Sequence, residues 1–193
     1  MTELQQFEDT PIRPLRRVEY ELLIEHGLIS EDDQVELIEG ILVAMSPQSS
    51  RHAEIIIQLT RIFIEGLGGR ASVRAQTPIA LSDTSEPEPD LALVAPGDYF
   101  EAHPTTAWLV IEVAGDSLRK DRVLKNRLYS ASGIPEYWII NVPAREIEVY
   151  REPSPDGYRT VTHHTPGEHI ACLQFPDVDI DIARLLGSRD ISR

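Results

Sequence analysis

Trp108-Leu-Val-Ile-Glu-Val-Ala114 is an almost entirely apolar segment, and Tyr137-Trp-Ile-Ile-Asn-Val142 is a second one. Residues 117–132, which lie between them, repeat apolar side chains at helical spacing and are followed by Gly133, a typical helix stop. Two apolar strands joined by a helix form a crossover unit, in which the strands run parallel within a buried sheet. The sequence therefore predicts an α/β fold built around this unit.

The spacing within residues 117–132 also predicts which side of the helix is buried. A helix that covers a sheet directs one apolar stripe, repeating about every 3.6 residues, toward the core. We expect this stripe to consist of Leu118, Val123, Leu124, Leu128 and Tyr129.

Three further helices are predicted outside the crossover unit. Residues 14–26 and residues 49–67 carry apolar side chains at helical spacing, and glycines follow both segments. The 49–67 segment is the stronger of the two, because a serine stands at its start. A short last helix is expected over residues 180–186.

Short strands are predicted where β-branched or aliphatic runs lie between turn residues. These runs are residues 70–76, 79–81 and 90–95. Residues 36–45 predict either two short strands turning at Glu39-Gly40 or one bulged strand. Near the C-terminus, residues 146–152 and 158–163 flank Ser154-Pro-Asp-Gly157 and predict a hairpin. The expected fold is a mixed β-sheet flanked by helices, with this hairpin added.

The length of 193 residues favours one domain. We expect residues 14–187 to form it, residues 1–13 to be a flexible lead and residues 188–193 to be a tail. The single Cys172 excludes an intrachain disulfide and fits a reducing compartment, so a cytoplasmic location is expected. No apolar stretch approaches the roughly 18 residues that a membrane span needs, which predicts no membrane association.

Two acidic residues stand where the sequence holds them rigidly. Pro89 fixes the backbone before Asp90, which begins an apolar strand. Glu112 interrupts the apolar run 108–114, and a carboxylate in such a strand needs a partner, either a cation or a structural ion pair. If the two strands are neighbours, both carboxylates reach one ion, in the arrangement that Mg²⁺ commonly uses.

A cationic side chain follows these acids on the predicted helix. Asp121 and Lys125 lie four residues apart and share one helix face. The stem of Lys125 can run along the margin of the core and carry its ammonium group toward the strand ends. No Gly-x-x-x-x-Gly-Lys loop and no Gly-x-Ser-x-Gly elbow occurs, which argues against a nucleoside triphosphatase and a serine hydrolase.

Several ordered motifs resemble the Uma-two family of "putative restriction endonucleases", which belongs to the PD-(D/E)XK nuclease superfamily. They are Glu36-Leu-Ile-Glu-Gly40, Met45-Ser-Pro47, His52, Pro89-Asp90, Ile111-Glu-Val113, Asp121-Arg-x-x-Lys125 and Gly133-Ile-Pro-Glu-Tyr-Trp138. The resemblance implies a restriction-endonuclease-like core. It also implies a Mg²⁺-dependent endonuclease, with Mn²⁺ as a substitute, that hydrolyses phosphodiester bonds in DNA and works as a homodimer.

Carried over to this sequence, the resemblance makes Asp90 and Glu112 the metal ligands and Lys125 the catalytic lysine. It adds Glu36 as a further acidic residue of the site. We interpret His52 and Asp121 as residues that support these groups without binding the metal.

Three features favour a different function. The superfamily pattern has its lysine two residues after the second acid, where this chain has Ala114, and Gly115-Asp116 replaces the more usual Ser-Pro. The net charge of −14 is also unfavourable for binding phosphates, although basic residues gather locally over residues 119–127. The alternative is a catalytically inactive nuclease fold that serves as an interaction or regulatory module.

Overall fold

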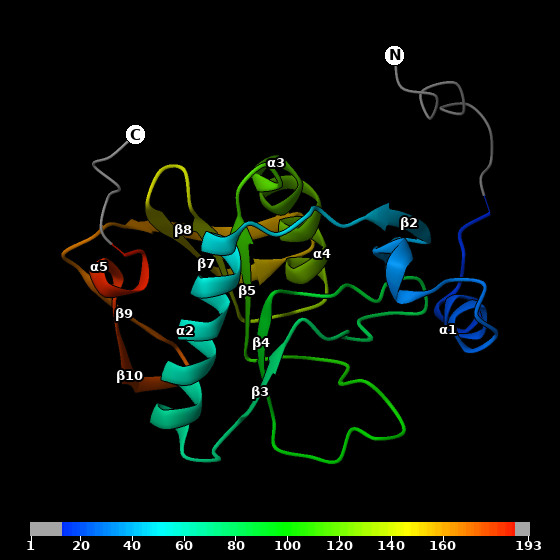
Figure 1. Ribbon diagram of the computed structural model, residues 1–193, viewed down its shortest axis with the longest axis horizontal. Helices are drawn as coiled ribbons and strands as arrows, with labels where there is room; N and C mark the ends of the chain where they lie inside the picture. Colours follow the sequence, from blue (N-terminus) through cyan, green and yellow to red (C-terminus); the bar gives the residue numbers. More distant parts are fainter. Residues whose placement is uncertain (1–12, 188–193) are drawn as a thin grey trace.

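A computed structural model describes residues 13–187. A six-stranded mixed sheet forms the centre of the molecule (Figure 1). In spatial order its strands are β3 (Ser72–Ala75), β4 (Leu91–Val94), β5 (Leu109–Ala114), β6 (Glu136–Asn141), β7 (Glu146–Ser154) and β8 (Gly157–His164). Only β5 and β6 pair in parallel, and the other neighbours are antiparallel. The parallel crossover unit and the mixed α/β fold predicted from the sequence are confirmed.

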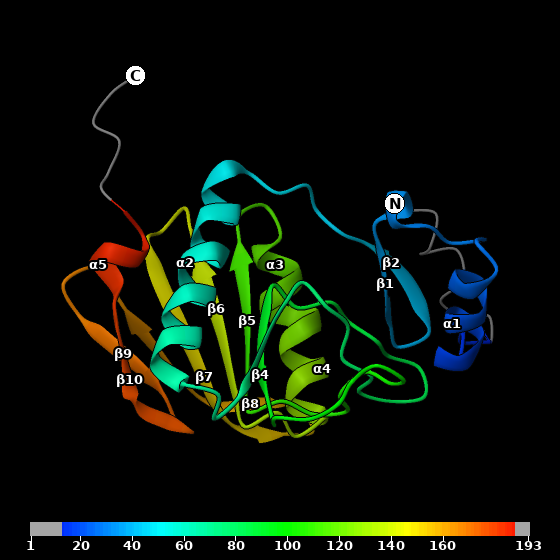
Figure 2. The same cartoon turned by 60° about the horizontal axis from the view of Figure 1, so that its bottom comes forward.

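Helices cover both faces of this sheet. The helix α2 (Ser50–Leu67) packs on one face, and its first turn is capped by the Ser49 hydroxyl, which accepts from the backbone N–H of His52. The other face carries a continuous helical segment made of α3 (Leu118–Lys120), η3 (Asp121–Lys125) and α4 (Asn126–Ala131) (Figure 2). The middle piece, η3, is a single π-helical turn.

Alternation along β5 decides which side chains face which helix. Ile111 and Val113 join the core under α2, whereas Val110 and Ala114 join the core on the α4 side. Since successive side chains of a strand point to opposite faces, Glu112 lies on the α4 side. The face of the sheet that holds Glu112 is therefore the face covered by the segment that carries Lys125.

Smaller units stand at the two ends of the molecule (Figure 2). At one end are α1 (Arg17–Glu25), η2 (Glu31–Asp33) and the hairpin of β1 (Val35–Ile38) with β2 (Ile41–Ala44). At the other end are β9 (His169–Cys172), β10 (Phe175–Asp181) and α5 (Ile182–Leu185). The two-strand alternative for residues 36–45 is thus the one that the structure adopts.

Several expectations need correction. Residues 79–81 form no strand, because Ile79 and Ala80 donate their backbone N–H groups to loop carbonyls of Pro87 and Pro104. The hairpin predicted over residues 146–163 is confirmed as β7 and β8, which are the last two strands of the central sheet. The separate C-terminal hairpin is β9–β10, which the sequence did not predict as strands.

The predicted buried stripe of the crossover helix was wrong at one position. Val123 is 64% exposed, whereas Lys125 is buried. A π-helical turn contains one more residue than an α-helical turn, so it shifts the face on which later residues lie. Residues 1–12 of the expected lead and the tail over residues 188–193 lie outside the described residues. Within residues 13–187 no helix is both long and apolar enough to cross a membrane.

Candidate active site

Asp90 and Glu112 lie side by side because of the pairing between β4 and β5. The antiparallel register matches Leu91 with Ile111, so its extension by one residue places Asp90 opposite Glu112. Directly opposite residues of an antiparallel pair have Cβ atoms about 4.5–5.5 Å apart and point to the same face. Two carboxylates that are 22 positions apart in the chain therefore meet at one end of the sheet.

The carboxylate of Asp90 is fixed by two hydrogen bonds. Its Oδ2 accepts from the backbone N–H of Val113 at 2.7 Å, which ties the start of β4 to β5. Its Oδ1 lies 2.9 Å from Nε2 of His52, on the first turn of α2. His52 thus contacts the predicted metal ligand directly and holds its orientation.

The carboxylate of Glu112 is only 5% exposed and has a different environment. Its Oε1 accepts from the ammonium of Lys125 and from the hydroxyl of Tyr129, both at 2.8 Å. Among residues 13–187, no side chain or backbone group donates to Oε2. Burial raises the pKa of Glu112 to about 8, Lys125 lowers it and the nearby carboxylate of Asp90 raises it further. Burial therefore disfavours the ionised form of Glu112.

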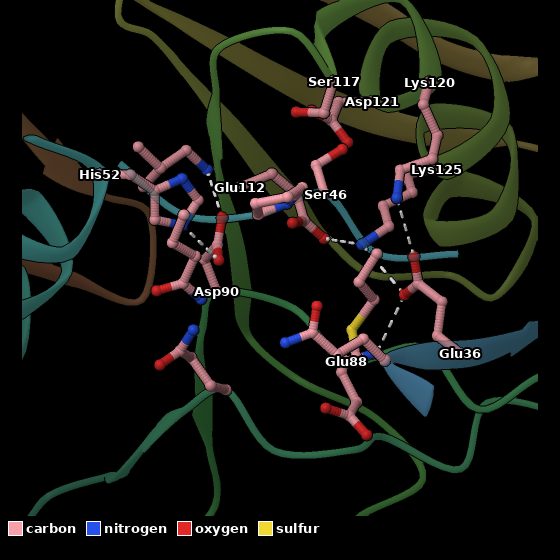
Figure 3. A pocket seen from close by; sticks show the side chains of 16 residues that line it. Glu36, Ser46, His52, Glu88, Asp90, Glu112, Ser117, Lys120, Asp121 and Lys125 are labelled. Carbon is pink, nitrogen blue, oxygen red and sulfur yellow. Dashed lines mark hydrogen bonds and ion pairs between the residues drawn. The ribbon is translucent and has the colours of Figure 1, made fainter. Parts of the chain in front are cut away.

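Lys125 lies between two acids (Figure 3). Its ammonium is 2.8 Å from Oε1 of Glu112 and 3.1 Å from Oε2 of Glu36, and its side chain is 4% exposed. Burial by itself lowers the pKa of Lys125, but the charges of Glu112 and Glu36 raise it above its ordinary value. The ammonium consequently stays charged and has a fixed position.

Glu36, on β1, brings the outer hairpin to this site. It is fully buried, and its Oε2 accepts from the backbone N–H of Glu88 at 3.2 Å. Its Oε1 accepts from the ammonium of Lys120 at 3.2 Å. Lys120, Glu88 and Tyr129 are contacts that the sequence interpretation did not place at the site. Lys120 stood in the basic run 119–127, but nothing in that run distinguished it from its neighbours.

The basic residues of this run have different partners in the structure. Lys120 and Lys125 reach the site, whereas Arg122 pairs with Glu148 on β7 at 2.6 Å and Arg127 pairs with Glu39 at 2.5 Å. The local positive charge predicted near the acids is therefore supplied by the two lysines.

A pocket of about 420 Å³ opens over these groups. Its walls include all six residues predicted for the site, namely Glu36, His52, Asp90, Glu112, Asp121 and Lys125. Asp121 accepts a hydrogen bond from the hydroxyl of Ser117 at 2.7 Å, and burial raises its pKa. The structure thus brings the predicted residues together, while their roles as ligands and catalysts stay predictions.

A comparison with protein families gives a match along most of the chain. The family model Uma2, described as "Putative restriction endonuclease", matches residues 17–183. The chain belongs to the Uma2 family. This confirms the resemblance drawn from the motifs and supports a nuclease-like function. Residues 17–183 include every predicted site residue of this Uma2 protein.

A solved structure has the same fold. The crystal structure of a "putative nuclease belonging to DUF820" from Anabaena variabilis ATCC 29413 superposes with a TM-score of 0.72 at 17% sequence identity. The match covers 90% of this chain and 98% of that chain. No curated protein matches the chain.

Proposed function

We propose that this protein is a Mg²⁺-dependent endonuclease that hydrolyses phosphodiester bonds in DNA. The observation that carries the proposal is that Asp90, Glu112 and Lys125 meet in one pocket. The two acids come from two paired strands, and the lysine comes from the helical segment that follows them. A pair of carboxylates with an adjacent ammonium supplies a metal-binding edge and a cation for phosphate charge.

The donor set fits a hard divalent cation. Oε2 of Glu112 has no hydrogen-bond donor among the described residues, and a cation would favour the ionised form that burial disfavours. Among residues 13–187, no three His, Cys, Asp or Glu side chains are grouped so that they could hold a metal ion. Two carboxylates suit Mg²⁺, which usually keeps water ligands and takes substrate phosphate oxygens. Mn²⁺ also prefers carboxylate and water ligands and is the expected substitute.

Each residue then has a role that follows from its contacts. Asp90 and Glu112 would hold the ion, which when bound activates a water molecule and neutralises charge on the scissile phosphate. Lys125 stabilises the negative charge that develops on the phosphate, because its ammonium is held beside Glu112.

The remaining side chains position these three. His52 orients the Asp90 carboxylate, and Glu36 holds Lys125 from the side opposite Glu112. Asp121 lies on the same helical segment and adds negative charge near Lys125. None of these supporting groups needs to touch the scissile phosphate.

A second candidate function is a catalytically inactive nuclease fold that acts as an interaction module. The net charge of −14 favours it, because nucleic-acid binders usually rely on excess positive charge. Ala114 also favours it, since the position of the lysine in the superfamily pattern has no cation here.

The test combines metal binding with cleavage of plasmid DNA. The wild type should bind Mg²⁺ in calorimetry and should nick supercoiled DNA only when Mg²⁺ or Mn²⁺ is present. Asp90→Asn keeps the side-chain shape but removes the charge, so both the binding heat and the nicking should disappear. The thermal melting of both proteins shows that the variant is folded.

Two outcomes would decide against the endonuclease. Nicking that persists in Asp90→Asn would show that it comes from another site or another protein. A wild type that neither binds metal nor cleaves DNA would favour the interaction module. Sedimentation at several protein concentrations tests the homodimer that the family resemblance implies.

A further inference from the structure

Two lysines share one buried carboxylate in the pocket. Glu36 receives Lys125 on Oε2 at 3.1 Å and Lys120 on Oε1 at 3.2 Å. Figure 3 shows both ammonium groups directed toward Glu36 from the same helical segment. Lys125 also contacts Glu112, whereas Lys120 forms an ion pair with Glu36 alone among residues 13–187.

The π-helical turn is the reason that both lysines face the pocket. Lys120 and Lys125 are five residues apart, and in an α-helix of 3.6 residues per turn such residues point in clearly different directions. In η3 the backbone N–H of Asn126 bonds to the carbonyl of Asp121, which is an i→i+5 bond. Residues five apart therefore come back to nearly the same face.

The two lysines differ in exposure. The side chain of Lys125 is 4% exposed and its ammonium is enclosed by two acids. The side chain of Lys120 is 22% exposed, and the residue lines the same pocket. An ammonium has three N–H donors, so Lys120 can keep its bond to Glu36 and still offer donors to a ligand.

We propose that Lys120 is a substrate-contacting residue that binds a backbone phosphate of the nucleic acid in this pocket. The inference rests on the proposed function, because it takes the pocket as the place where the strand is cleaved. Lysine binds phosphate as a point charge and needs no fixed planar geometry, which suits a partly exposed side chain. Glu36 then pairs with both lysines. It holds the ammonium of Lys125 beside the proposed metal ligands and the ammonium of Lys120 near the opening of the pocket.

A purely structural role for Lys120 would be to neutralise Glu36. Such a role predicts a change in stability but no change in the salt dependence of DNA binding. A phosphate contact predicts the opposite signature, because each neutralised phosphate releases counterions and contributes about 0.9 to the slope of log affinity against log salt concentration.

The experiment measures the affinity of a fluorescent duplex oligonucleotide by anisotropy over a series of salt concentrations. Ca²⁺ replaces Mg²⁺, because it takes the same oxygen ligands and leaves metal binding in place. The proteins are the wild type, Lys120→Gln, Lys120→Arg and Arg119→Gln. Arg119 is the matched control, since it is the preceding cation on α3 and is exposed outside the pocket.

Lys120→Gln should make the slope shallower by about 0.9, whereas Lys120→Arg and Arg119→Gln should leave it unchanged. Melting temperatures show whether the variants remain folded during the measurement. An unchanged slope in Lys120→Gln, an equal loss in Arg119→Gln, or no DNA binding by the wild type would overturn the proposal.

Cleavage with Mg²⁺ is assayed separately on the same proteins. A wild type that cleaves DNA while Lys120→Gln keeps its slope refutes only the role of Lys120. A wild type that binds DNA with a slope dependent on Lys120 but never cleaves it refutes only the nuclease.

Discussion

Glu112 and Glu136 are both buried glutamates on neighbouring strands, β5 and β6, and both stand among apolar residues. Their surroundings differ in how completely the carboxylate is satisfied. Glu136 lies at the start of β6 beside the β9–β10 hairpin, whereas Glu112 lines the pocket with Asp90.

Every oxygen of Glu136 has a donor. Its Oε1 accepts from Nε1 of Trp138 at 3.0 Å and from Nε and Nη2 of Arg151 at 2.9 Å and 2.7 Å. Its Oε2 accepts from the backbone N–H of Leu173 at 2.7 Å, in the turn between β9 and β10. This carboxylate joins β6, β7 and the C-terminal hairpin, and it is a structural ion pair.

Among the described residues, donors reach only one oxygen of Glu112, and its pKa is raised to about 8. Burial therefore does not distinguish a structural acid from one suited to bind a ligand. The distinction lies in whether the carboxylate keeps an oxygen without a donor and faces a pocket. The following predictions test this contrast, from the largest expected effect to the smallest.

The contrast predicts opposite effects on DNA cleavage. Glu112→Gln should lower kcat/KM by about 10³-fold, because an amide cannot replace a charged metal ligand and the loss corresponds to about 4 kcal/mol. Glu136→Gln should leave kcat/KM within about threefold of the wild type in the folded fraction. Steady-state plasmid cleavage measures both. An equal loss in the two variants would remove the contrast.

For stability, we expect the larger loss in Glu136→Gln and not in Glu112→Gln. Glu136→Gln should lower the free energy of unfolding by about 2–3 kcal/mol, because it leaves the Arg151 guanidinium without a charged partner. The loss stays below that of a fully buried pair, since the Arg151 side chain is 36% exposed. Glu112→Gln should not lower the free energy of unfolding, because the amide is neutral without the proton uptake that burial imposes on Glu112. Urea unfolding at neutral pH measures both, and a larger loss in Glu112→Gln would contradict the contrast.

Per pH unit, the smallest predicted effect is a pH dependence that belongs to Glu112. Its pKa of about 8 in the folded protein is above its ordinary value of 4.5. The folded protein thus binds more protons, so this group makes folding less favourable as pH rises from about 4.5 to about 8.

Metal binding needs the ionised carboxylate, so affinity should rise about tenfold per pH unit below about 8 and then level off. Calorimetry in buffers of different ionisation heat should show about one proton released per ion below pH 8 and almost none above it. Glu136→Gln should keep this profile. A flat profile in the wild type would show that Glu112 is not a ligand.

The meeting of Asp90 and Glu112 was largely predictable. Pro89 fixes the start of β4, and the apolar runs on both sides define two buried strands. Their adjacency was assumed in the sequence interpretation, and the register of Leu91 with Ile111 now provides it.

The position of Lys125 beside the acids was predicted from α-helical spacing, which does not by itself explain it. An α-helical spacing places Val123 toward the core, yet Val123 is exposed and Lys125 is buried. The π-helical turn has no sequence signature in residues 117–132. It is stabilised by long-range contacts, including the ion pair of Arg122 with Glu148 on β7 and the hydrogen bond from Tyr137 to the Asp121 carbonyl.

The β9–β10 hairpin was missed because its strands are partly polar. It is stabilised by apolar residues that pack under α2, such as Ile170 and Val178, and by the bond from Leu173 to Glu136. None of these contacts is visible in the local pattern, because the partners are distant in the chain.

By itself, the sequence determined the α/β crossover unit and the rigid placement of Asp90 and Glu112, since both follow from the local alternation of apolar residues and from proline geometry. Only the tertiary structure decided that Glu112 rather than Glu136 keeps an oxygen without a donor from residues 13–187, and that Lys120 and Lys125 meet on Glu36. Local patterns indicate most of the buried residues, whereas the satisfaction of a buried charge depends on groups that folding brings from elsewhere in the chain.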